Sequence, residues 1–240
     1  MPYRLRMVGG PNGSGESYLT KVIQEQYSIR MENYVNADDI EAALHSKQSF
    51  DFAPYSIKAN TETLQAFYDA HPLGKETGLL KVERNRLRLT DAMPPMGYVG
   101  AVVADFIRRA MMAEGANFSF ETVMSGRDKI ALLQEAKDLG YKIYLYYVCT
   151  ADPIINMARV IERVAEGGHD VPEHLIVKRW TNSLENLLPA IRLAHRAYLF
   201  DNSGTGHEVI AESFRGDLKF NVSRTTGWFR QFVLRKIEAE

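Results

Sequence analysis

Hydrophobic residues recur along the chain with two alternating periods, one typical of strands and the other of helices. Short runs rich in β-branched and aromatic residues predict strands within 4–8, 33–39, 116–125, 142–150 and 197–204. Apolar residues at helical spacing predict helices within 17–28, 38–46, 98–115, 127–141, 151–168 and 172–195. Strands that alternate with helices indicate an α/β fold with a mostly parallel sheet and helices on both faces.

The ends of several elements carry recognisable signals. Asp38 or Asp39 can cap the second predicted helix, and Asp152 followed by Pro153 is typical of a helix start. Gly140 is a typical helix stop. Ligands of parallel sheets bind beyond the carboxyl ends of the strands, so the residues after each predicted strand are the first candidates for a site.

The remaining segments have weaker patterns. Within residues 47–97 we expect helices at 56–71 and at the arginine-rich 79–93, followed by a break at 93–98. At the C-terminal end, residues 206–222 favour a β-hairpin and residues 227–240 a terminal helix.

Composition removes some function classes. The chain has 29 basic and 30 acidic residues, a net charge of -1, and 45% hydrophobic residues in 240. This balance gives no overall attraction to nucleic acid or anionic membrane, and we expect neither as a partner. The N-terminus lacks the pattern of a signal peptide and no stretch is long and apolar enough for a membrane span, which favours a cytoplasmic protein. The single cysteine, Cys149, lies in an apolar run and is expected to be buried.

The segment "GGPNGSGES", residues 9–17, resembles a phosphate-binding loop. A strand, a glycine-rich turn and a helix in that order form an anion-binding nest, because backbone N–H groups point at the ligand. The candidate nucleotide-binding residues are Gly10, Pro11, Asn12, Gly13, Ser14, Gly15 and Ser17. The hydroxyl of Ser17 would bind Mg²⁺. The alternative for the whole segment is a glycine-rich turn that occurs by chance.

Glu16 departs from this pattern, because a lysine stands at that position in G-x-x-x-x-G-K-[ST]. That lysine places positive charge between the outer phosphates. A unit charge pair at ~4 Å contributes about 4 kcal/mol at an effective dielectric near 20, and reversing the sign roughly doubles the change. We therefore expect this chain to bind nucleotide poorly and to be catalytically inactive.

Acidic residues follow two further predicted strands. Asp38 suits a general base that accepts the proton of an acceptor hydroxyl, although helix capping would also explain it. Glu121 and Thr122 end another strand, where they could contact substrate. Glu121 could instead hold a water molecule on the metal ion. The alternative for Glu121 is a solvated strand end.

Arginines gather in the segment 159–180. Arg159 and Arg163 share one helix face, and Arg179 follows a glycine-containing loop that suits a lid. Clustered arginines neutralise a transferring phosphoryl group and donate paired hydrogen bonds to it. Alternatively, Arg159 and Arg163 form a solvated face paired with glutamates of the same helix.

Assembled, these segments resemble the zeta-toxin family of P-loop kinases over most of residues 3–203. The resemblance rests on "GGPNGSGES", "YVNADDIEAAL", "NFSFETVMS", "YKIYLYYVCTADPIINMARVIERVAEGGHDVPEHLIVKRW" and "AYLFDNS". It implies a single domain over 1–240 with a P-loop kinase-like three-layer sandwich, an insert at 47–97, an arginine-bearing lid at 159–180 and an extension at 204–240.

The resemblance also implies a function. The expected cofactor is ATP or GTP with Mg²⁺, and the expected acceptor is a sugar nucleotide such as UDP-N-acetylglucosamine. Asp38 would match the catalytic base, Glu121 and Thr122 a substrate-contacting pair, and the lid arginines the phosphate clamps. Such toxins are paired with an antitoxin protein. Glu16 and the insert are departures from the family.

Three hypotheses about the function of this chain follow. The first is a zeta-type kinase inactivated by Glu16, either naturally or by an introduced change. The second is a natural pseudokinase that acts as a binding module. The third is a kinase for another acceptor, such as an antibiotic or a nucleoside.

Overall fold

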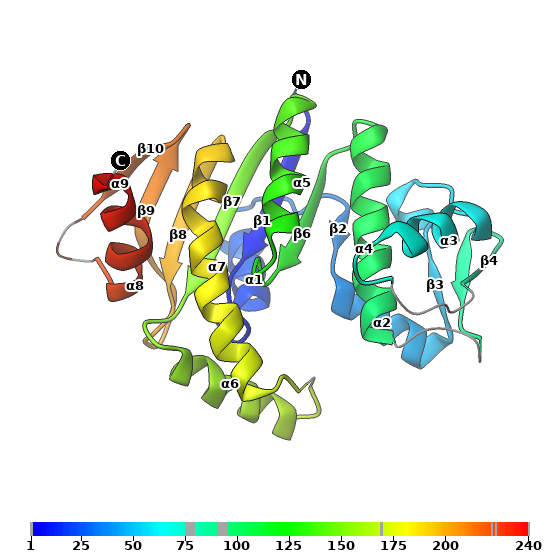
Figure 1. The fold of residues 1–240 in the computed structure, drawn as a ribbon, viewed down its shortest axis with the longest axis horizontal. Helices are drawn as coiled ribbons and strands as arrows, with labels where there is room; N and C mark the ends of the chain where they lie inside the picture. The colour runs from blue at the N-terminus through cyan, green and yellow to red at the C-terminus, as the bar shows by residue number, and fades with distance from the viewer. Residues whose placement is uncertain are drawn as a thin grey trace. The chain divides into compact units, whose positions relative to one another are not determined.

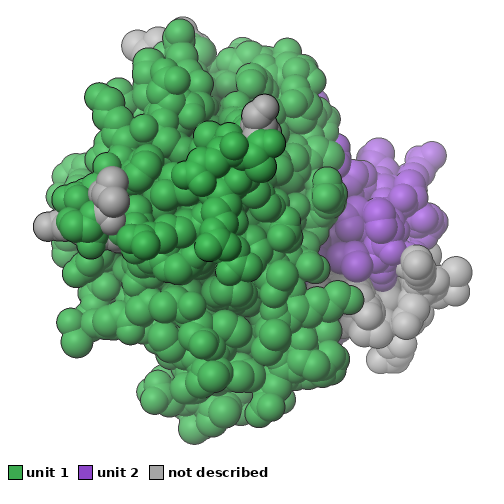
Figure 2. Space-filling model, turned by 60° about the vertical axis from the view of Figure 1, so that its left-hand side comes forward, with its two compact units in different colours: residues 1–31, 119–240 green, residues 32–118 purple. Residues whose placement is uncertain are grey.

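The computed structural model describes residues 2–74, 80–90, 96–168, 170–221, 223 and 225–239. Two compact units share the chain (Figure 2). Unit 1 comprises Met1–Met31 and Ser119–Glu240, and unit 2 comprises Glu32–Phe118. The predicted insert, 47–97, falls within unit 2, and its residues 75–79 and 91–95 lie outside the described ranges.

Unit 1 contains the main sheet. Its strands are β1 (Arg4–Gly9), β6 (Phe118–Thr122), β7 (Lys142–Cys149), β8 (Arg196–Asp201), β9 (Glu208–Phe214) and β10 (Asp217–Phe220). They follow the order β10-β9-β8-β7-β1-β6. Strand β7 is parallel to β1 and to β8, whereas β9 and β10 form an antiparallel extension. The predicted C-terminal hairpin is β9–β10.

Helices cover both faces of this sheet (Figure 1). They are α1 (Glu16–Gln26), α5 (Arg127–Asp138), α6 (Pro153–Ala165), α7 (Glu173–Leu193), α8 (Gly227–Phe229) and α9 (Arg235–Glu238), with a π-helical turn at Arg230–Leu234 between the last two. In Figure 1, α5 and α7 lie in front of the strands and α1 lies behind them. The predicted three-layer α/β sandwich with a mostly parallel sheet is confirmed.

The sequence pattern explains why these segments form this core. The side chains of Leu5 and Met7 on β1 are fully buried, as the two-residue period requires. Strand β7 is buried along most of its length, which explains its continuous apolar run and includes the buried thiol of Cys149. At the start of α6, Asp152 caps the helix as predicted, by accepting a hydrogen bond from the N–H of Ile154.

Unit 2 is built from shorter elements. They are β2 (Tyr34–Val35), α2 (Ala37–Lys47), β3 (Ser49–Asp51), the 3-10 turn η1 (Ala53–Tyr55), α3 (Thr61–Ala70), β4 (Lys81–Glu83), β5 (Arg86–Arg88) and α4 (Met96–Ala113). Strands β3, β5 and β4 form a small antiparallel sheet in that order.

The helix predicted at 79–93 is wrong where the residues are described. Residues 81–88 form the β4–β5 hairpin instead. Arg84 and Asn85 have φ angles of 50° and 63°, as a tight two-residue hairpin turn demands. Val82 and Leu87 face each other across the hairpin. The apolar residues here alternate with a period of two, as a strand requires. The arginines between them have high helix propensity, and this propensity favoured the wrong prediction.

Helix starts in unit 2 also differ from prediction. Helix α2 is capped by Asn36, whose side chain accepts a hydrogen bond from the N–H of Asp38. Asp38 and Asp39 therefore lie in the first turn, where their charges favour the helix dipole. The helix predicted at 56–71 begins only at Thr61, after the cap residue Asn60. None of the helices in the described ranges has the length and apolar character needed to cross a bilayer.

Candidate functional site

The glycine-rich segment joins β1 to α1 as a tight loop. Gly13 and Gly15 adopt φ angles of 79° and 98°, in the left-handed region that glycine tolerates best. The N–H of Ser14 donates to the carbonyl of Pro11 across 3.0 Å, which closes the turn. Helix α1 begins directly after this turn, so its N-terminal N–H groups face the loop.

Neighbouring backbone leaves no room for a side chain at Gly10 or at Gly13. A Cβ at Gly10 would lie 2.2 Å from the carbonyl oxygen of Val148, and a Cβ at Gly13 would lie 2.7 Å from that of Asn156. The loop glycines are therefore required by close packing as well as by φ.

Two asparagines fix the loop from the sides. Asn156 on α6 is fully buried and donates through Nδ2 to the Asn12 carbonyl at 2.7 Å and to the Ser14 hydroxyl at 2.9 Å. Its Oδ1 accepts a hydrogen bond from Thr150. Asn202, directly after β8, donates through Nδ2 to the Ser14 carbonyl at 2.8 Å. The loop is therefore held in one conformation before any ligand arrives.

Sequence reasoning missed these two clamps. Asn202 follows a predicted strand, so the rule that sites lie at the carboxyl ends of strands could have found it. Asn156 stands three residues before Arg159, on the side of α6 that bears on the loop. Neither signal distinguishes a clamp from an ordinary loop or helix residue without the three-dimensional neighbours.

Glu16 turns back onto the loop. Its Oε2 accepts a hydrogen bond of 3.0 Å from the backbone N–H of Gly15, one of the donors that the loop geometry offers to an anion. That donor is therefore already bonded within the chain and is not open to an anion. Once ionised, the carboxyl also adds negative charge to the loop.

The surroundings of Glu16 favour its neutral form. Burial raises the pKa of this carboxyl to about 8, and the nearby charge of Glu121 acts in the same direction. The backbone N–H groups of Glu16 and Gly15 and the charge of Arg163 lower the pKa, but by less than burial raises it. Near neutral pH the loop thus holds a carboxyl that resists ionisation.

Glu121 lies beside the same loop. Its two carboxylate oxygens accept hydrogen bonds from the Ser17 hydroxyl at 2.9 Å and from the Thr20 hydroxyl at 2.5 Å. The predicted metal ligand Ser17 and the predicted substrate residue Glu121 are therefore brought together. Thr122 takes a different part: its carbonyl accepts from Gly10 N–H, and its hydroxyl accepts from Met124 N–H.

The predicted arginines also converge on the loop. Arg159 donates to the carbonyls of Gly13, at 3.5 Å, and Asn202, at 2.8 Å. Arg179 donates to Oδ1 of Asn12 at 3.2 Å. Arg163 lies close enough to lower the pKa of Glu16. Arg159 therefore does not belong to a solvated arginine face, because its side chain is bonded to the loop.

The remaining predicted residue, Asp38, belongs to unit 2. It is exposed in the first turn of α2. Its backbone N–H bonds to the cap residue Asn36, which leaves the carboxylate out of the capping role. A general base must also come within hydrogen-bond reach of the hydroxyl that it deprotonates, so the assignment of Asp38 stays a prediction.

An aromatic pair borders the loop on another side. Tyr18, which is 59% exposed, stacks on His207 with ring centroids 5.1 Å apart. The ring of His207 lies against Gly15, since a Cβ there would be 3.3 Å from Nε2. Burial lowers the pKa of His207, which disfavours the charged form of the ring.

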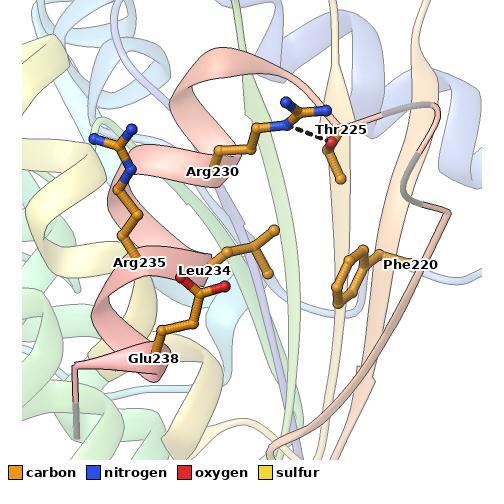
Figure 3. Close-up of a pocket in the computed structure, with 6 residues that line it drawn as sticks. All are labelled: Phe220, Thr225, Arg230, Leu234, Arg235 and Glu238. Atoms are coloured by element: carbon orange, nitrogen blue, oxygen red, sulfur yellow. Dashed lines mark hydrogen bonds between the residues drawn. The ribbon is translucent and has the colours of Figure 1, made fainter.

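A separate hollow lies near the C-terminus. It has a volume of about 250 Å³ and is lined by Phe220, Thr225, Arg230, Leu234, Arg235 and Glu238 (Figure 3). Arg230 donates to the Thr225 hydroxyl at 2.7 Å. Small-molecule sites have volumes of roughly 300–1,000 Å³. This hollow is smaller, and the phosphate loop remains the candidate site.

Comparisons with known proteins address the fold. No family model matches the chain. An uncharacterised protein of Haemophilus influenzae is 33% identical over 63 residues, which cover 26% of this chain and 45% of that protein. The match thus spans less than half of that relative.

Solved structures resemble the chain over most of its length. A crystal structure of AvrRxo1-ORF1 with ORF2 and ATP has a TM-score of 0.54 at 14% identity, and the match covers 92% of this chain and 61% of that chain. A structure from the PezAT chromosomal toxin–antitoxin system of Streptococcus pneumoniae has a TM-score of 0.52 at 14% identity, covering 98% and 78%. At such identities the likeness shows the fold alone.

Proposed function

We propose that the chain is a phosphotransferase of zeta-toxin type whose nucleotide loop is blocked by Glu16. The observation that carries the proposal is the hydrogen bond from Gly15 N–H to the Glu16 carboxylate, inside an otherwise complete cradle. The pre-formed loop, its two asparagine clamps and the converging arginines support a phosphate site. Glu16 opposes a polyphosphate there, because its carboxyl takes up a backbone donor and, once ionised, repels phosphate charge.

The proposed cofactor is ATP or GTP with Mg²⁺, bound once position 16 carries a lysine. The backbone of the loop fits phosphates, whereas Glu16 does not, so no transfer is expected from the chain as it stands. The AvrRxo1-ORF1 structure, which shares this fold, was obtained with ATP, and this supports the choice of nucleotide.

Individual roles follow from position. We assign Gly10, Pro11, Asn12, Gly13, Ser14, Gly15 and Ser17 to phosphate and metal binding. Arg159, Arg163 and Arg179 would neutralise phosphate charge, since Arg159 and Arg179 already donate hydrogen bonds to the loop. Asp38 would accept the proton of the acceptor hydroxyl, and Glu121 and Thr122 would contact the acceptor.

The proposed acceptor is a sugar nucleotide such as UDP-N-acetylglucosamine, and the proposed biological role is that of a cytoplasmic toxin paired with an antitoxin protein. The PezAT toxin–antitoxin structure shares the fold, which supports a partner of this kind. An acceptor of another class would leave the loop assignments unchanged.

A natural pseudokinase is the second candidate. It is favoured by the fit of Glu16, whose carboxyl bonds to the loop and has its pKa raised to about 8, so that it is accommodated as a neutral group. In this candidate the loop serves as a closed structural turn.

Phosphoryl transfer tests the proposal. Glu16→Lys would be incubated with γ-labelled ATP or GTP, Mg²⁺ and a panel of sugar nucleotides, antibiotics and nucleosides. We expect label transfer to one acceptor class, loss of that transfer in Glu16→Lys/Asp38→Asn, and none with the unmodified chain. Transfer to a compound outside the sugar nucleotides would revise the acceptor alone. A folded Glu16→Lys form that neither transfers label nor slows bacterial growth would favour the pseudokinase.

A further inference from the structure

Helix α6 exposes an apolar stripe on the side that faces away from the phosphate loop. Ile154, Ala158, Ile161 and Ala165 are all exposed and follow one another at helical spacing. Ile154 is 64% exposed and Ile161 is 60% exposed. Val164, which is 37% exposed, widens the stripe at its C-terminal end.

The opposite side of the same helix is already used. Asn156 and Val160 are buried, and Asn156 is bonded to the phosphate loop. Arg159 also turns inward, toward Gly13 and Asn202. The side of α6 that bears Asn156, Arg159 and Val160 is therefore packed against the rest of unit 1, whereas the side that bears the stripe is exposed. Single exposed apolar residues are ordinary, but a continuous row of them marks an interaction surface.

The charges around the stripe restrict what can cover it. The exposed residues that flank it and end the helix are acidic: Asp152, Glu162 and Glu166. Of the two basic residues on α6, Arg159 bonds to the loop, and Arg163 is only partly exposed and lies near Glu16. An occupant must therefore bring an apolar row together with positive charge.

A second copy of this chain does not meet that requirement. In an antiparallel pairing centred on the stripe, Glu166 of one copy would approach the acidic start of the other helix at Asp152. In a parallel pairing, Glu162 would face Glu162. Like charges in these positions are destabilising.

We infer that the outer face of α6 docks an amphipathic helix of a partner protein whose apolar row is flanked by lysine or arginine. The apolar row of the partner would pack between Ile154 and Ile161, against the small side chains of Ala158 and Ala165. Its basic residues would pair with Glu162 and Glu166. The stripe lies outside the phosphate loop, so this docking does not depend on nucleotide binding or on Glu16.

Two synthetic helical peptides test the inference, both with leucines in an a/d pattern, one flanked by lysines and the other by glutamates. Their binding to the full chain would be measured by fluorescence anisotropy. We expect the lysine peptide to bind at least about tenfold more tightly than the glutamate peptide. Ile154→Ser/Ile161→Ser should lose roughly tenfold of that affinity. Glu162→Lys/Glu166→Lys should reverse the preference between the peptides.

Leu139→Ser is the matched control, because Leu139 is 52% exposed but lies on the loop that follows α5. It should bind the lysine peptide like the unmodified chain, and circular dichroism establishes that every variant is folded. Equal binding of the lysine peptide to the unmodified chain and to Ile154→Ser/Ile161→Ser would overturn the inference. So would self-association in analytical ultracentrifugation that the same double substitution abolishes, because the stripe would then be a self-interface.

Discussion

The carboxylate of Glu16 accepts a hydrogen bond from the backbone N–H of Gly15, with 3.0 Å between Oε2 and N. The bond joins neighbouring residues, and it places an acidic group within the glycine-rich loop. Near neutral pH this group is mainly uncharged, because burial raises its pKa to about 8. The nine-residue segment 9–17 thus combines a glycine-rich turn before a helix with an acidic side chain that is bonded to that turn.

Glu16 makes stability depend on pH in a specific direction. Its pKa is raised to about 8 in the folded state, mainly by burial, whereas an unfolded glutamate has a pKa of about 4.3. Between these values the folded state holds a proton that the unfolded state releases, so the free energy of unfolding falls as pH rises toward 8 and is flat above. Glu16→Gln lacks this slope.

Urea unfolding at pH 5.5 and pH 9 measures the effect. Because Glu16 keeps some contact with solvent, we expect the stability difference between the two forms to move by about 1–3 kcal/mol in favour of Glu16→Gln at the higher pH. Parallel pH profiles of the two proteins would show that the carboxyl is not buried as described.

Gly13 is a position where side-chain packing adds to backbone strain. Alanine there would take a φ of 79° and would place Cβ 2.7 Å from the Asn156 carbonyl oxygen. Gly140 has a similar φ of 83° with nothing within 4 Å, and so provides a matched control. We expect Gly140→Ala to cost about 1 kcal/mol and Gly13→Ala about 3 kcal/mol or more, measured by thermal unfolding. Equal costs would mean that the loop can move away from Asn156.

Asn156 should contribute to stability as well as to the site. Alanine at this buried position removes its bonds to Asn12 and Ser14 and deprives Thr150 of its acceptor. We expect a loss of about 2–4 kcal/mol in chemical denaturation, since several polar groups lose partners together. Asn182 on α7 is the control, because no hydrogen bond of its side chain is found in the described part of the chain. A change at Asn156 as small as that of Asn182→Ala would show that water replaces the clamp.

Trp228 attaches the C-terminal helices to the end of β8. Its indole N–H donates to Oδ2 of Asp201 at 2.8 Å, and its side chain is 2% exposed. Trp228→Phe keeps an aromatic ring but removes the donor, for an expected loss of about 1–3 kcal/mol. Limited proteolysis should then cleave near residues 225–227 faster than in the unmodified chain. An unchanged cleavage rate would mean that ring packing alone holds this segment.

The sequence predicted the sheet and helices of unit 1 because their patterns are long and agree with their end signals. Strand β7 and helix α6, for example, combine a clear period with a clear start. Unit 2 was harder to predict, because its strands are two or three residues long and a run of arginines obscures the alternation of Val82 and Leu87. Short elements are determined by turn conformation at Arg84 and Asn85, which propensity does not reveal.

The candidate site shows the same division. The loop, Ser17 and the lid arginines follow from residue types at fixed spacing. The clamps Asn156 and Asn202 do not, because their importance comes from atoms contributed by segments far apart in sequence. The inward turn of Glu16 toward Gly15 was also beyond prediction. The sequence shows only that a glutamate stands where the loop pattern has a lysine. The structure shows that this glutamate is hydrogen-bonded to the loop itself.

Calorimetric titration of Mg-ATP and Mg-GTP into the unmodified chain, Glu16→Lys and Glu16→Gln tests the central claim most directly. We predict no measurable binding by the unmodified chain and binding at least about a hundredfold tighter by Glu16→Lys, which supplies the missing donor and charge. Above pH 8, where Glu16 is ionised, Glu16→Gln should lie between them, because it removes the negative charge without supplying a cation. Tight binding by the unmodified chain, or none by a folded Glu16→Lys form, would contradict the account.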